Sequence, residues 1–263
     1  MIRLEIIGGG RMGEALLGGL LAAQWAAPAE LAVVERLPER RQQLTELFPG
    51  VAVLAEPTAA DGAVVAVKPN DVAETCRVLA GVGVQRVLSI AAGVTTAALT
   101  EALGDGIAVV RAMPNTPALV RTGASAIAPG ASATTADLDW AASILAEVGV
   151  VVRVDEHDLD IVTGLSGSGP AYVFLMVENL ILAGVAGGLS QEMAELLATQ
   201  TLLGAATLLH TSEDDAAALR EAVTSPGGTT AAGLRVLTEA GVPAAIVDAV
   251  LAAAERSREL GRA

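Results

Sequence analysis

The sequence predicts an α/β protein in which a helix-covered sheet is followed by a second domain that is all helical. Short runs rich in valine, isoleucine and alanine alternate with helical patterns up to residue 154, and no strand pattern appears after it. A glycine-rich turn follows the first of these runs. We therefore expect a sheet domain at residues 1–154 and a helical domain at residues 155–263.

The predicted strands are spaced along the whole first domain, at residues 4–7, 31–34, 51–54, 63–67, 86–90, 107–110, 123–128 and 150–154. Alternation of such strands with helices is typical of a parallel sheet with helices on both faces. The predicted helices of the second domain are residues 168–187, 190–209, 213–223, 229–240 and 242–260. Ser168 and Pro170 supply an N-cap and a first-turn proline, so the first of these helices should begin there.

The glycine-rich turn lies between the first predicted strand and the first predicted helix. Gly8, Gly10 and Gly13 form the GxGxxG pattern, which allows a tight turn, close approach of a pyrophosphate and close packing of helix on strand. This placement is what a doubly wound, Rossmann-type domain requires. We expect the pyrophosphate of NAD(H) or NADP(H) at this turn, beside the N-terminus of the helix.

The end of the second strand leaves the choice between NADH and NADPH open. Glu35 occupies the position where an acid binds the ribose hydroxyls of NAD and repels a 2′-phosphate. Arg36 favours the opposite choice, because its guanidinium can pair with that phosphate. Lys68, the only lysine of the chain, stands before Pro69 at the end of the strand at 63–67, on the rim where a cofactor binds.

A second unusual segment, TSPGGTT at residues 224–230, lies between two predicted helices. The next helix starts near Thr229, so its unpaired backbone N–H groups are suited to an anion such as a carboxylate. Three hydroxyls, those of Ser225, Thr229 and Thr230, add donors, while the two glycines, Gly227 and Gly228, let a ligand approach the main chain. From the pattern alone, Thr229 or Thr230 serves equally well as a plain N-cap.

Composition and charge disfavour a nucleic-acid partner and a membrane-spanning segment. The net charge of −14 and an aromatic content of 2% disfavour nucleic acid as a partner. Cys76 is the only cysteine and fits a core position in a cytoplasmic protein. The apolar stretch at residues 171–189 carries Glu178 and Asn179 at its centre, which favours a core or subunit interface over a membrane.

The chemistry must therefore depend largely on a cofactor. His157 and His210 are far apart in the sequence, and no metal-ligand spacing is present, so we expect no metal. Without a lysine in the helical domain, hydride transfer to an already activated acceptor, such as a protonated cyclic imine, fits best. A carboxylate beside that imine would suit the segment at residues 224–230.

Six motifs together resemble the pyrroline-5-carboxylate reductases. They are GGGRMG at residues 8–13, AVKP at 66–69, SIAAG at 89–93, RAMPNTP at 111–117, VTGLSGSGPAY at 162–172 and LREAVTSPGGTTAAGLRVLTEAG at 219–241. The resemblance implies reduction of 1-pyrroline-5-carboxylate to L-proline by NAD(P)H, the last step of proline synthesis. It also implies a homodimer formed through the C-terminal helices, which in the family often assembles further.

The resemblance implies roles for particular residues as well. The pyrophosphate would be held by Gly8, Gly9, Gly10, Arg11, Met12 and Gly13. The ribose and nicotinamide would be lined by two short segments: Ala66, Val67, Lys68 and Pro69, and Ile90, Ala91 and Ala92. The substrate would be received by Glu156, Gly227, Gly228, Thr229 and Thr230, with Ser225 and Thr230 as catalytic candidates. From charge alone Glu156 would be a solvated acid, and Arg111 and Asn115 fit a structural role as well as a catalytic one.

Two other functions fit parts of the pattern. One is a different two-domain reductase that acts on a hydroxy acid or a deazaflavin, and the other is a nucleotide-sensing regulator without activity. The absence of a lysine in the second domain and the presence of SPGGTT disfavour the first, and the intact hydroxyl and glycine segment disfavours the second.

Overall fold

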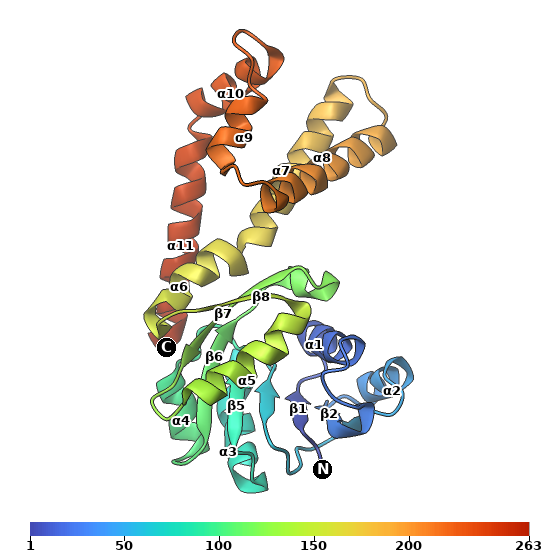
Figure 1. Cartoon of the computed structure of the whole chain (residues 1–263), viewed down its shortest axis with the longest axis vertical. Helices are drawn as coiled ribbons and strands as arrows, with labels where there is room; N and C mark the ends of the chain where they lie inside the picture. The colour runs from blue at the N-terminus through green and yellow to red at the C-terminus, as the bar shows by residue number, and fades with distance from the viewer. Residues whose placement is uncertain (263) are drawn as a thin grey trace. The chain divides into compact units, whose positions relative to one another are not determined.

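The computed structural model describes residues 1–262, which form two compact units (Figure 1). The first unit contains residues 1–168 together with the chain from residue 251 onward, and the second contains residues 169–250. Residues 155–168 and the end of the last helix thus pack with the sheet, although the sequence assigns them to the helical domain. The predicted boundary between residues 154 and 155 stays a prediction.

Eight strands of the first unit form one sheet in the order β3-β2-β1-β4-β5-β6-β7-β8 (Figure 1). The strands are β1 (Leu4–Ile7), β2 (Leu31–Val34), β3 (Ala52–Leu54), β4 (Ala63–Val65), β5 (Arg86–Ser89), β6 (Ala108–Met113), β7 (Gly123–Pro129) and β8 (Gly149–Arg153). From β1 the sheet is extended first on one side, by β2 and β3, and then on the other side, starting with β4. The strands β1 and β4 at this reversal of strand order are parallel to each other. Ligands of doubly wound sheets bind at the carboxyl ends of the strands at this reversal.

The sheet is not wholly parallel, which corrects the sequence prediction. Strand β7 runs antiparallel to β6, with Arg111 opposite Ala128, and β8 is parallel to β7. The reason is the short connection between β6 and β7, which holds only the short 3₁₀ helix η3 (Thr116–Val120). A parallel return needs a crossover of about a dozen residues or more, so this strand returns as an antiparallel neighbour.

Helices cover both faces of the sheet. Leucines of α1 (Arg11–Ala22) and α2 (Pro38–Leu47) share one core with Ile144 and Leu145 of α5 (Thr135–Leu145). A second core contains buried residues of α3 (Val72–Val82) and α4 (Thr96–Leu103). Cys76 lies in this second core, as predicted, and burial raises the pKa of its thiol to about 11. A thiol held protonated in this way is inert at neutral pH.

The second unit is built from helices alone. It contains α7 (Gly169–Ala186), α8 (Gln191–Thr211), α9 (Ala216–Ala222), α10 (Thr229–Glu239) and the first part of α11 (Val242–Arg262). The α9 helix begins three residues later than predicted because the carboxylate of Asp215 caps it, accepting the N–H of Ala218 at 2.8 Å.

The long apolar helix does not begin as a separate helix at Ser168. It is preceded by α6 (Leu159–Val162) and a π-helical turn, η6 (Thr163–Gly167), within a helical run from Glu156 to Ala186. That run begins with the 3₁₀ turn η5 (Glu156–Asp158), and further short 3₁₀ turns are η1 (Pro28–Glu30), η2 (Pro69–Asp71) and η4 (Ala146–Val148). The run from Glu156 to Ala186 is long and apolar enough to cross a membrane, and none of its apolar window is buried within this chain. A helix covered by a partner subunit meets the same criteria.

Candidate active site

The glycine turn has the geometry that the GxGxxG pattern predicts. Gly8 adopts a φ of +111°, and a Cβ atom there would lie 2.6 Å from the carbonyl oxygen of Ala66. A Cβ atom on Gly13 would meet the carbonyl oxygen of Gly8, whereas one on Gly10 would meet nothing within 4 Å. The first and third glycines therefore allow close packing, and the second leaves open space beside the N-terminus of α1.

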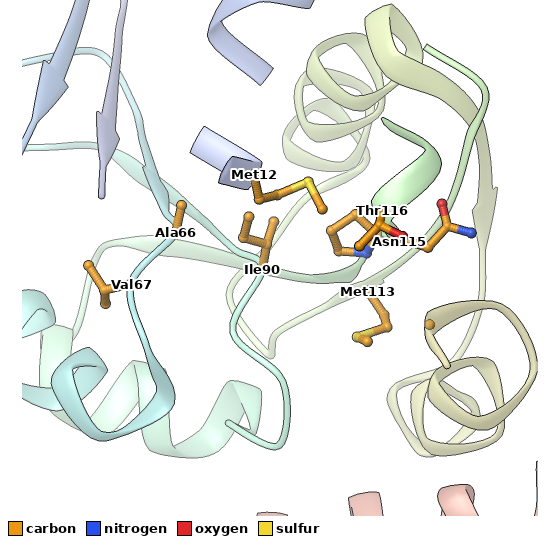
Figure 2. Close-up of a pocket in the computed structure, with 9 residues that line it drawn as sticks. Met12, Ala66, Val67, Ile90, Met113, Asn115 and Thr116 are labelled. Carbon is orange, nitrogen blue, oxygen red and sulfur yellow. The ribbon is translucent and has the colours of Figure 1, made fainter. Parts of the chain in front are cut away.

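The close approach of Gly8 to Ala66 brings two of the predicted cofactor segments together at the strand reversal. Beside them lies a cavity of about 270 Å³ at the carboxyl ends of β4, β5 and β6 (Figure 2). The cavity is lined by Met12, Ala66, Val67, Ile90, Met113, Pro114, Asn115, Thr116 and Gly167. Its apolar lining and its position suit a nicotinamide ring, and it holds only part of a dinucleotide.

Four residues predicted to bind the cofactor line this cavity, namely Met12, Ala66, Val67 and Ile90. Lys68 and Pro69 lie exposed just outside it, while Ala91 is buried and Ala92 half-buried. Met113, Pro114, Thr116 and Gly167 were not predicted as site residues. Met113, Pro114 and Thr116 belong to the RAMPNTP motif, which covers the end of β6 and the residues after it, and Gly167 belongs to the VTGLSGSGPAY motif.

Asn115 has a clear structural function in addition to its place in the cavity wall. Its side-chain amide donates to the carbonyl oxygen of Ser166 at 3.0 Å and accepts the N–H of Ala124 at 2.8 Å. The buried side chain thus fixes η3 to both β7 and the π-helical turn. These two bonds use one of the two N–H donors of the amide and one acceptor position of its oxygen, so Asn115 shapes the cavity.

Glu35 and Arg36 lie directly after β2, at the predicted position for the adenosine ribose. The carboxylate of Glu35 accepts the N–H of Gly9 at 3.2 Å and that of Leu37 at 3.0 Å. The guanidinium of Arg36 forms an ion pair with Asp71 at 3.1 Å. Both side chains are therefore engaged before a cofactor binds, but the Arg36 pair is largely exposed and can be exchanged at small cost.

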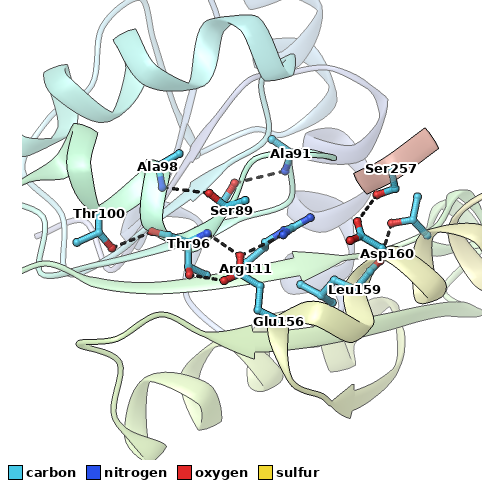
Figure 3. Close-up of polar contacts among 12 residues, drawn as sticks. Ser89, Ala91, Thr96, Ala98, Thr100, Arg111, Glu156, Leu159, Asp160 and Ser257 are labelled. Carbon is cyan, nitrogen blue, oxygen red and sulfur yellow. Dashed lines mark hydrogen bonds and ion pairs between the residues drawn. The ribbon is translucent and has the colours of Figure 1, made fainter. Parts of the chain in front are cut away.

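Glu156 belongs to a polar network at the start of α4 (Figure 3). Its carboxylate accepts the N–H of Thr96 at 2.7 Å, the hydroxyl of Thr96 at 2.6 Å and the guanidinium of Arg111 at 3.1 Å. Burial alone would raise the pKa of Glu156, but these bonds outweigh it, so the pKa lies below its ordinary value. The ionised side chain neutralises the buried Arg111 and satisfies the N-terminus of α4.

The end of α11 packs beside the same network. The hydroxyl of Ser257 donates to the carboxylate of Asp160 at 2.6 Å (Figure 3). A Cβ atom on Gly93, where φ is +75°, would lie 3.1 Å from Cβ of Leu260. The last helix therefore supports the loop that contains Ile90, Ala91 and Ala92.

The segment at residues 224–230 belongs to the second unit and opens α10. The N-cap of this helix is Gly228, which makes no side-chain capping bond, and Thr229 and Thr230 are its first helical residues. A Cβ atom on Gly228 would meet the hydroxyl oxygen of Ser225, and Gly227 has a φ of +70°. The alternative that Thr229 or Thr230 is the N-cap is thus not what the structure shows. The first N–H groups of α10 are left for another acceptor.

One group of possible metal ligands occurs among the described residues, at Asp155, His157 and Asp158. Two of the three side chains are exposed, and an exposed acidic cluster is common without an ion. The expectation of no metal rested on the absence of metal-ligand spacing in the sequence, and it stays a prediction.

The fold and the site define a two-domain, NAD(P)H-dependent oxidoreductase. A family model for "Pyrroline-5-carboxylate reductase dimerisation" matches residues 156–260, and one for "NADP oxidoreductase coenzyme F420-dependent" matches residues 3–93. Pyrroline-5-carboxylate reductases of Synechocystis and Mycobacterium tuberculosis are 44% and 43% identical, over 99% of this chain and 99% and 97% of theirs. The chain belongs to the pyrroline-5-carboxylate reductase family.

Solved structures agree with this assignment. A pyrroline-5-carboxylate reductase from Coxiella burnetii has a TM-score of 0.91 and 36% identity, covering 98% of both chains. A Plasmodium falciparum pyrroline carboxylate reductase with NADP bound has a TM-score of 0.87 and 30% identity, covering 99% of this chain and 98% of its own. The predicted family, two-domain fold, NAD(P)H-dependent reduction and place in proline biosynthesis are confirmed. The match to a dimerisation domain also implies a homo-oligomer.

Proposed function

We propose that the hydride is transferred at the cavity beside Ala66 and Ile90, and that residues 224–230 hold the substrate. The observation that carries this proposal is the contact between the glycine turn and the segment after β4, which puts the pyrophosphate position next to an apolar cavity. A cofactor bound along residues 8–13 would place its nicotinamide in this cavity, near Met12, Met113 and Gly167.

The reaction needs little from the protein besides orientation. The hydride adds to the carbon of the protonated C=N bond, the electron pair of that bond goes to the ring nitrogen, and oxidised cofactor and proline result. The N–H groups at the start of α10 suit the substrate carboxylate, and the hydroxyls of Ser225 and Thr230 suit the ring nitrogen. In this proposal Gly227, Gly228 and Thr229 supply main-chain contacts.

Glu156 fits a supporting function better than a direct contact. Both of its carboxylate oxygens already accept bonds from Thr96 or Arg111 within the same unit. A contact with substrate would have to replace one of these bonds. We therefore propose that Glu156 acts mainly by fixing Thr96, which lies just beyond the loop that contains Ile90 and Ala92. The predicted direct contact stays a prediction.

We further propose a homodimer formed through the helical unit, in the cytoplasm and without a nucleic-acid or membrane partner. Phe174 and Leu182 are 60% and 64% exposed on α7, which a second copy of the chain would cover. The net charge of −14 and the buried, single Cys76 agree with this proposal.

A direct assay tests the proposed function. Purified protein should oxidise NADPH or NADH when 1-pyrroline-5-carboxylate is added, and should release proline in equal amount. The oxidation is measured as a loss of absorbance of the reduced nicotinamide. A hydroxy acid or a deazaflavin should give no turnover. Folded protein that shows no turnover of the imine with either cofactor would contradict the proposal.

A further inference from the structure

Gly9, the middle glycine of the turn, is held at both of its backbone polar groups by side chains of opposite charge. Its N–H donates to the carboxylate of Glu35 at 3.2 Å, and its carbonyl oxygen accepts from Nε of Arg40 at 2.8 Å. Glu35 follows β2 and Arg40 lies on α2, so both bonds to the glycine turn come from residues 35–40.

Arg40 is fixed by further contacts of its own. Its guanidinium pairs with the carboxylate of Glu14, in the first turn of α1, and donates to the side chain of Gln43 at 3.1 Å. The Arg40 side chain is only 24% exposed, which makes this pair more than a solvated surface contact. The planar, forked guanidinium is suited to such a bridge, whereas a lysine could not reach the same partners with one rigid group.

Because the peptide bond is planar, the two bonds to Gly9 also fix the direction of the next N–H group, that of Gly10. In a trans peptide the C=O of one residue and the N–H of the next point in opposite directions. A Gly9 carbonyl held toward Arg40 therefore aims the N–H of Gly10 away from α2. A Cβ atom on Gly10 would meet nothing within 4 Å, and α1 has no side-chain cap, so space is left beside this peptide. Between two glycines the backbone has little stiffness of its own, so the side chains must fix the orientation.

We propose that Arg40 is a positioning residue for cofactor binding, which holds the peptide between Gly9 and Gly10 so that the Gly10 N–H faces the pyrophosphate. Glu14 orients the guanidinium and offsets its charge. This inference rests on the proposed placement of the cofactor along residues 8–13. The pyrophosphate is common to both cofactors, so Arg40 acts on NADH and NADPH alike. In this it differs from Glu35 and Arg36, which lie at the ribose position.

The test is a binding measurement on three variants of the full-length protein. Dissociation constants for NADH and NADPH are measured from nicotinamide fluorescence without substrate, so a failure of imine reduction bears only on the proposed function. Arg40→Met should raise both constants by about tenfold, which is typical for the loss of a bond from a charged donor. Arg40→Lys should recover part of this loss. Glu14→Gln, which keeps the bond to Gly9, should raise both constants by a smaller factor.

The same variants separate positioning from stability. Arg40→Met should keep kcat at saturating cofactor and the KM for 1-pyrroline-5-carboxylate close to wild type. Arg77→Met, an exposed arginine on α3 away from the turn, is the matched control and should bind both cofactors normally. A lower melting temperature in Arg40→Met with unchanged dissociation constants would overturn the proposal, and so would weaker binding of NADPH alone. If Arg40→Met does not fold, equal constants for Glu14→Gln and wild type would overturn it.

Discussion

At the scale of single residues, Thr230 is the second residue of α10, and its hydroxyl is not needed to cap the helix because Gly228 is the N-cap. Thr230→Ala should therefore lower kcat/KM by the equivalent of about 2 to 4 kcal/mol if the hydroxyl acts mainly in the transition state. Steady-state kinetics and cofactor binding measure this, and the dissociation constant for cofactor should not change.

Thr238→Ala is the matched control for this prediction. Thr238 lies on the same helix, and its hydroxyl donates to the carbonyl oxygen of Leu234 at 2.9 Å. This variant should have wild-type kinetics. Wild-type rates in Thr230→Ala as well would show that the hydroxyl is not part of the reaction.

We expect single residues at the end of β2 to decide cofactor choice as well. Glu35→Ser should shift the ratio of kcat/KM values toward NADPH by at least about tenfold, or about 1.4 kcal/mol, because a carboxylate no longer faces the 2′-phosphate. Arg36→Ala should shift the ratio toward NADH. Both ratios come from parallel measurements with the two cofactors.

The ion pair between Arg36 and Asp71 adds a third variant to this comparison. Asp71→Asn frees the guanidinium, so it should favour NADPH. Unchanged ratios in all three variants would mean that backbone and shape alone hold the adenosine ribose.

At the scale of elements, β1 carries a carboxylate inside the sheet. Glu5 is fully buried, and both of its oxygens accept the N–H of Thr58, at 3.1 and 3.2 Å. Burial raises the pKa of Glu5 to about 7, although the N–H of Thr58 acts in the other direction. The folded protein thus binds a proton that the unfolded chain has lost.

A carboxyl group with a raised pKa makes stability fall as pH rises. The contribution of the protonated Glu5 is complete below the ordinary value of 4.5 and is lost as pH rises through about 7. Its size is at most about 3.5 kcal/mol, at roughly 1.4 kcal/mol per pKa unit. Denaturant unfolding from pH 5 to 8 should show this slope in the wild type and a weaker one in Glu5→Gln. Glu101→Gln, at an exposed site of α4, should keep the wild-type slope. Equal slopes in all three proteins would contradict the prediction.

At the scale of the whole molecule, the helical unit has too little core of its own for its apolar content. Its buried apolar residues are Ala194 and Ala198, whereas α7 exposes large side chains along its length. Leu182→Asp should therefore yield a monomer with reduced activity, because each dimer would bury two charged groups. Leu47→Asp, at a site of similar exposure on α2, should stay dimeric. Sedimentation at micromolar concentration distinguishes the two, and a dimeric Leu182→Asp variant would argue against this interface.

The sequence by itself determined the fold class and the conformation of the glycine turn after β1. Glycines at positions 8, 10 and 13 have local consequences, and strand and helix periodicity is also a local property, so both can be read without the rest of the chain. The positions of β1 and β2, the start of α10 and the burial of Cys76 followed from such local patterns.

Only the tertiary structure decided which distant residues meet. The bonds from Thr96 and Arg111 to Glu156 and the bond from Arg40 to Gly9 join segments that are far apart in the sequence. The antiparallel direction of β7 is likewise seen only in its pairing with β6. The sequence predicted a solvated acid at Glu156 because it shows the charge of this residue but not its hydrogen-bond partners. Contacts of this kind depend on how the strands are ordered in the sheet, and no periodicity within one segment records that order.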